Sequence, residues 1–130
     1  MSFDPAKISK EQVRDQFLAH LRERILVLDG ATGTALQELD LTAEDFGGED
    51  LLGCNENLVL TRPEVIGSIH RRYLEAGADC IETNTFGATP LVLDEYQLGE
   101  KTEEINILGS QIARAEAQRF ATPEKPRSVI

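Results

Sequence analysis

Two apolar segments that each end abruptly in polar residues constrain the fold of this chain most. Residues 25–28 form a continuous apolar run that stops at Asp29 and Gly30, and residues 76–86 pass from a helix end through a buried-type strand to polar side chains. The first run shows no alternation of apolar and polar residues, which suits a parallel strand covered on both faces. Because parallel strands bring their carboxyl ends to one edge of a sheet, we expect both polar segments on one rim.

Amphipathic helices are expected before the first strand and between the two strands. The first covers residues 9–24, and the second begins near residue 61 and stops at Gly77, with Pro63 in its first turn. Both starts carry the pattern of a capping box, Ser9 with Gln12 and Thr61 with Glu64. Both helices therefore have clear sequence signals at their starts.

A third helix and a third strand follow the second strand. The helix is predicted from four apolar residues at helical spacing: Ile105, Leu108, Ile112 and Ala115. Residues 128–130 resemble the start of another buried strand. The polar stretch of residues 30–60 is too long for a plain strand-to-helix connection, and a short helix is predicted at residues 35–39 within it.

Alternating helices and buried-type strands predict an α/β fold with a parallel sheet. So few strands make a poor sheet, and we therefore expect the chain to be cut within its third strand. The expected organisation is a helical extension over residues 1–24 and a partial domain over residues 25–130.

Composition excludes several classes of function. A formal net charge of −10 and the lack of a basic cluster oppose binding to nucleic acid or to an anionic membrane. No window approaches a membrane span, and the start of the chain lacks a targeting pattern, so a cytoplasmic protein is expected. Cys54 and Cys80 lack metal-ligand spacing and are expected to be reduced, buried thiols. His20 and His70 have no second ligand at i+4 and are expected on solvated helix surfaces.

Three polar segments are candidate sites. Residues 29–34 follow the first strand and offer backbone amides to an anion, or else form a tight turn whose Asp29 caps a helix. Neither a P-loop nor the paired aspartates of haloacid dehalogenase phosphatases are present, since Ala31 stands where the second aspartate belongs. Residues 82–85 are favoured as a functional site, with Glu82 and Asn84 on one side of the strand, opposite its threonines. Residues 54–57 either bind a ligand or, as we favour, order the long excursion.

Three segments together, residues 25–34, 53–66 and 76–86, resemble the homocysteine S-methyltransferase family, most closely the homocysteine-binding modules of its cobalamin-dependent members. The likeness covers roughly residues 20–130 in the right order. It implies a (β/α)8 barrel that binds homocysteine at the carboxyl ends of its strands and holds the sulfur on zinc. This chain would then supply about two and a half βα units of that barrel, after an extra N-terminal helix.

The resemblance also implies roles for individual residues. Asp29 is expected to accept a hydrogen bond from the substrate ammonium, and Gly30 and its neighbours to offer amides to the carboxylate. The rim of the second strand is expected to complete the substrate site with Glu82, Thr83, Asn84 and Thr85. Zinc would deprotonate the homocysteine thiol. The thiolate would take a methyl group from methylcobalamin, supplied by methyltetrahydrofolate, and become methionine.

Other parts of this chemistry are expected outside the chain. The family's zinc ligands are cysteines on later strands, expected beyond Ile130, and neither Cys54 nor Cys80 matches them. The fragment alone is therefore expected to be inactive and to hold no cofactor. Its expected partners are homocysteine and the folate and cobalamin modules of the same parent chain. Two alternatives stay open: a family member with a sulfonium or betaine donor, and a noncatalytic truncated product that pairs its open sheet edge with another chain.

Overall fold

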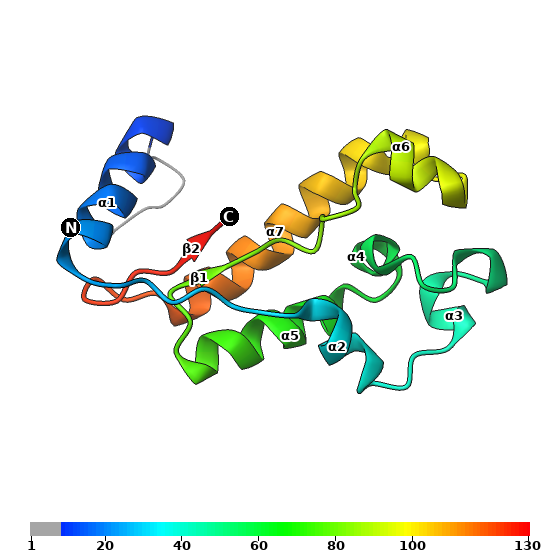
Figure 1. The fold of residues 1–130 in the computed structure, drawn as a ribbon, viewed down its shortest axis with the longest axis horizontal. Coiled ribbons are helices and arrows are strands. Elements are labelled where there is room, and N and C mark those ends of the chain that lie inside the picture. Colours follow the sequence, from blue (N-terminus) through cyan, green and yellow to red (C-terminus); the bar gives the residue numbers. More distant parts are fainter. Residues whose placement is uncertain (1–8) are drawn as a thin grey trace.

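The computed structural model describes residues 9–130 and shows an α/β fold that is mostly helical, with a small parallel sheet (Figure 1). The long helices are α1 (Lys10–Glu23), α5 (Pro63–Ala76) and α7 (Thr102–Phe120), and the strands are β1 (Cys80–Ile81) and β2 (Ser128–Val129). Short α-helices are α2 (Thr32–Gln37), α3 (Ala43–Phe46), α4 (Leu58–Thr61) and α6 (Pro90–Leu93). Single 3-10 turns are η2 (Glu49–Leu51), η3 (Asn55–Asn57), η4 (Asp94–Tyr96) and η5 (Gly99–Lys101).

The sheet has the predicted parallel direction. β1 pairs with β2, with Cys80 opposite Ser128, and the extended segment after α1 joins β1 from the other side through one parallel bridge between Leu28 and Cys80. The Asp29 amide extends this contact by donating to the Cys80 carbonyl over 2.9 Å. Both polar segments of the sequence therefore start at the same edge of the sheet.

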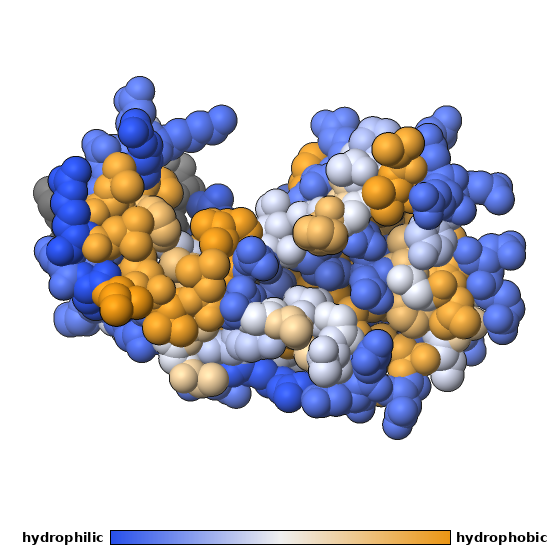
Figure 2. Space-filling view, in the orientation of Figure 1, coloured by the Kyte–Doolittle hydropathy of each residue, from blue (hydrophilic) through white to orange (hydrophobic). Residues whose placement is uncertain are grey.

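The predicted strand at residues 25–29 is wrong in extent and in burial. It contributes one bridge rather than a ladder, and Ile25 and Val27 are 87% and 55% exposed. The described residues therefore cover the side that carries Ile25 and Val27 only in part, and the apolar run that predicted burial on both sides stands partly in solvent. Figure 2 shows apolar side chains gathered over α1 and the segment that follows it.

Of the two signals that predicted the ends of the second helix, the glycine stop is confirmed and the capping box is wrong. Gly77 ends α5 in the left-handed conformation, with φ of 110°, as expected for a glycine stop. The capping box of Thr61 with Glu64 is wrong, because Thr61 is the last residue of α4 and its hydroxyl donates to the Asn57 carbonyl. The capping box at Ser9 is confirmed in α1, which contains no buried residue.

The core lies between the helices and β1. α5 and α7 pack against each other, and Figure 1 shows α7 running from beside α6 to the strands, next to α5. The buried face of α7 includes Ile105 as predicted, whereas Ala115 is exposed and Ala113 and Ala117 are buried instead. The long excursion folds into α2, α3 and α4, which contribute Leu36, Phe46 and Leu58 to the larger hydrophobic cluster. The predicted short helix at residues 35–39 is observed three residues earlier, as α2.

His70 contradicts the prediction of a solvated histidine. It lies on α5 with 2% of its surface exposed, and neither ring nitrogen has a hydrogen-bond partner among the described residues. Burial lowers the pKa of the ring, and nearby Glu116 opposes that shift only in part. His70 is therefore a neutral ring in an apolar environment, which leaves two polar atoms unsatisfied.

We predict that His70 makes the chain sensitive to mild acid. Because the folded state lowers the pKa of His70, protonation favours the unfolded chain, and stability falls by up to about 1.4 kcal/mol per unit as pH drops below about 6.5. His70→Leu should remove this slope and stabilise the chain at about pH 5.5. Urea unfolding between about pH 7.5 and about pH 5.5 measures the effect. His20→Gln is the matched control, and an unchanged slope in His70→Leu would contradict the prediction.

No helix in the described part of the chain is long and apolar enough to cross a membrane.

Candidate functional site

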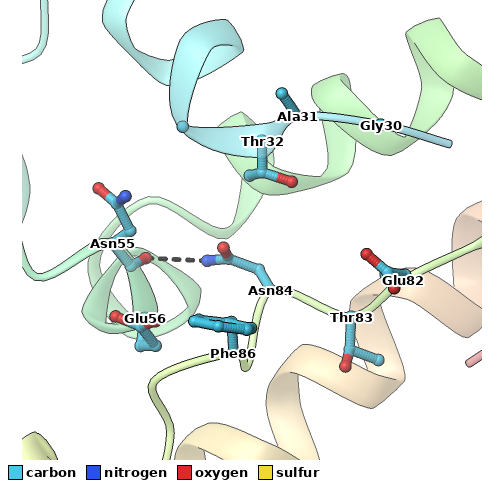
Figure 3. A pocket seen from close by; sticks show the side chains of 10 residues that line it. Gly30, Ala31, Thr32, Asn55, Glu56, Glu82, Thr83, Asn84 and Phe86 are labelled. Atoms are coloured by element: carbon cyan, nitrogen blue, oxygen red, sulfur yellow. Dashed lines mark hydrogen bonds between the residues drawn. The ribbon is translucent and has the colours of Figure 1, made fainter.

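A polar cavity of about 380 Å³ opens at the edge of the sheet where the two polar segments meet. Thr32 at the start of α2 and Asn84 in the loop after β1 face each other across it, with Glu82 at one end (Figure 3). The lining comes from three parts of the chain: Gly30, Ala31, Thr32 and Gly33; Asn55 and Glu56; and Glu82, Thr83, Asn84 and Phe86. The structure thus brings the predicted site segments together.

Asp29 links the two predicted segments directly. Its carboxylate oxygens both lie 3.1 Å from the Glu82 amide nitrogen and accept its hydrogen. Burial raises the pKa of the Asp29 carboxyl, and this amide opposes the shift. Asp29 is half-buried and is not among the residues that line the cavity, so its observed role is to hold the ends of the two strand segments in register.

The four residues after β1 alternate as predicted. The Thr83 and Thr85 hydroxyls lie on one side and hydrogen-bond to each other over 2.7 Å. Asn84 is buried, and its amide donates to the Asn55 carbonyl over 2.8 Å (Figure 3). Glu82 is exposed at the rim of the cavity. Thr85 lies outside the lining.

Residues 54–57 combine both of the alternatives raised by the sequence. Asn57 orders the excursion, because its buried amide donates to the Phe46 carbonyl over 2.7 Å. Asn55 and Glu56 line the cavity instead, in line with the ligand-binding alternative that the sequence analysis did not favour. A run of polar residues shortly after Gly53 indicated a candidate ligand-binding loop. The sequence did not indicate that η3 would contact the loop after β1, because the two are about 30 residues apart.

The charge of the cavity favours a cationic group. The described residues that line it include the carboxylates of Glu56 and Glu82 but no lysine or arginine. The Asp29 carboxylate lies next to Glu82, whose amide hydrogen it accepts. Hydroxyls and amides from Thr32 and Asn84 add hydrogen-bonding groups of both kinds. The arrangement therefore suits a small polar molecule with an ammonium group.

A zinc site is not formed by the described residues. Cys54 and Cys80 are both buried free thiols whose pKa is raised by burial, which opposes the thiolate form that binds zinc. No group of three or more His, Cys, Asp or Glu side chains in residues 9–130 is placed to hold a metal ion. The described residues therefore do not supply the tetrahedral zinc site that the resemblance implies for the family.

Comparison with known proteins gives a consistent match. Residues 26–130 match the homocysteine S-methyltransferase family. The chain is 45% identical over 122 residues to methionine synthase of Mycobacterium leprae (strain TN), which covers 94% of this chain and 10% of that protein. It is 46% identical over 110 residues to methionine synthase of Mycobacterium tuberculosis (strain ATCC 25618 / H37Rv), covering 85% of this chain and 9% of that protein. The chain thus spans about a tenth of the length of these relatives.

Proposed function

Because this chain belongs to the homocysteine S-methyltransferase family, we propose that its polar cavity binds the amino-acid end of homocysteine for methyl transfer to the sulfur. The observation that carries the proposal is the cavity itself, which is lined by the carboxylates of Glu56 and Glu82 and has no basic side chain among its described lining residues. The product of such a transfer is methionine, in agreement with the names of the relatives.

We assign roles in this site to the residues present. Glu82, which lines the cavity, attracts the substrate ammonium, and Asp29 adds negative charge beside it, since its carboxylate accepts the Glu82 amide hydrogen. The backbone amides at Gly30 and Ala31 are available to the substrate carboxylate. Asn84 holds the opposite wall through its bond to Asn55, and Thr83 and Thr85 stabilise the loop that follows β1.

The finer parts of the proposal concern the whole protein. The parallel sheet and its covering helices support an incomplete (β/α)8 barrel over residues 25–130, with residues 1–24 as a helical extension. Zinc and cobalamin are assigned to parts of the parent protein other than residues 9–130, as are the folate and cobalamin modules with which this domain would work. The described residues contribute substrate binding, and no step of the transfer itself is assigned to them.

A ligand series tests the proposal and gives a second prediction. We expect L-homocysteine and L-homoserine to bind the chain with similar affinity, because the described cavity recognises the amino-acid end. A compound without the ammonium group, 4-mercaptobutyrate, should bind about 10-fold to 100-fold more weakly, since it leaves the carboxylates unpaired. Calorimetric titration of the 130-residue chain measures all three. Equal binding of 4-mercaptobutyrate and homocysteine would reject the ammonium site.

A further inference from the structure

We propose that Glu56 is a positioning residue that fixes the loop at the mouth of the cavity. The loop consists of residues 85–88 and is called the rim loop below. The Glu56 carboxylate accepts the Gly87 amide hydrogen over 2.8 Å, across 31 residues of sequence. η3 and the loop after β1 are thereby joined twice, since Asn84 also donates to the Asn55 carbonyl. The two walls of the cavity are therefore held as one unit.

The contact leaves no room for a side chain at position 87 unless the Glu56 carboxylate moves. A Cβ added to Gly87 would lie 2.7 Å from Glu56 Oε1, closer than real Cβ atoms come, and 3.1 Å from its Cδ, which is a tight contact. Gly87 is not among the glycines with positive φ, so its backbone does not itself require glycine. The close approach of the Glu56 carboxylate is the physical reason for a glycine at this position.

The rest of the rim loop is anchored on α7. The Asn106 amide donates to the Ala88 carbonyl over 2.8 Å, and the Thr85 methyl lies so close to Gly109 that a Cβ there would be 2.7 Å away. Between these anchors Phe86 stands fully exposed beside the cavity (Figure 3). Without Glu56, the Gly87 amide loses its partner and the segment that carries Phe86 loses its attachment to η3.

Amide hydrogen exchange of the labelled 130-residue chain tests the proposal. In Glu56→Ala we expect the Gly87 amide to exchange about 10-fold to 100-fold faster, while amides of β1 and α7 keep their rates. Glu56→Gln retains an oxygen acceptor and should stay within about 3-fold of the parent. Gly87→Ala should speed exchange in the rim loop as Glu56→Ala does. The double variant should exchange little faster than either, because both substitutions disrupt the same contact between Glu56 and Gly87.

Homocysteine affinity in the same samples shows whether the loop positions the site. We expect Glu56→Ala to bind more weakly at an unchanged melting temperature, and Glu56→Gln, which keeps the acceptor oxygen but not the charge, to bind more tightly than Glu56→Ala. Unchanged Gly87 exchange in Glu56→Ala, a Gln variant as impaired as the Ala variant, or unchanged affinity would each overturn the proposal. The affinity test rests on the proposed function. If the parent chain does not bind homocysteine, that function fails, whereas Gly87 exchange still decides whether Glu56 fixes the rim loop.

Discussion

Asp79→Asn should lower the free energy of unfolding by about 2–3 kcal/mol at neutral pH, because it leaves a buried charge pair broken. The Asp79 side chain is 4% exposed, and both of its oxygens accept hydrogens from the Arg24 guanidinium over 2.9 Å. It also accepts the Val27 amide hydrogen over 3.0 Å, and Arg127 lies 3.9 Å away. This carboxylate, next to β1, thus joins the segment that follows α1 to the residue that precedes β2. Arg24 is partly exposed and can return to water, which keeps the loss at the lower end for a buried pair.

The effect of Asp79 should depend on pH in a defined direction. Its ion pair lowers the pKa of the folded carboxyl to about 2, below the unfolded value, so its stabilisation is present above about pH 4 and is lost as pH falls toward about pH 2. The difference between parent and Asp79→Asn should shrink by about half at pH 3. Urea unfolding measures it. Glu38→Gln is the matched control, because Glu38 pairs with Arg72 on the surface and should change stability by less than about 0.5 kcal/mol. A similar loss in both variants would contradict the account.

Asp29→Asn should weaken homocysteine binding by about 10-fold to 100-fold with little loss of stability. Asparagine keeps an oxygen that accepts the Glu82 amide hydrogen, so the strand ends stay in register while the negative charge is removed. Asp29→Ala removes both and should reduce stability as well as binding. Titration calorimetry with a parallel melting curve separates the two effects. If Asp29→Asn binds as tightly as the parent, Asp29 serves the register of the sheet alone.

The elements with strong local signals were predictable from sequence. The Ser9 capping box, the glycine stop at Gly77 and the helical spacing on α7 each predicted an element that the structure confirms. The positions of the two polar segments at one edge also followed from parallel strand direction. These features depend on residues near one another in the chain, or on the one rule that parallel strands share an end.

The predictions of burial and of side-chain contacts failed mainly where they depend on residues distant in the sequence. Residues 25–28 have the composition of a buried strand, but whether they are covered depends on neighbours that the local pattern does not specify. His70 lies four residues from both Ile66 and Leu74 and so shares the buried face of α5, but its polar ring favoured a solvated position in the sequence analysis. The contact between Glu56 and Gly87 was not predicted, since the two residues are 31 positions apart in the sequence. Local sequence therefore predicted elements better than it predicted which side chains meet.

The most direct test of the account is a map of homocysteine binding on the isotopically labelled 130-residue chain. Increasing L-homocysteine should shift the backbone resonances of Gly30, Ala31, Glu82, Thr83 and Asn84, and these shifts should saturate together. Amides of α1 should stay in place, because α1 does not line the cavity. The same titration of Asp29→Asn should need about 10-fold to 100-fold more ligand for the same shifts. No shifts at the cavity, or shifts spread over α1 as well, would contradict the claim that this cavity binds the amino-acid end of homocysteine.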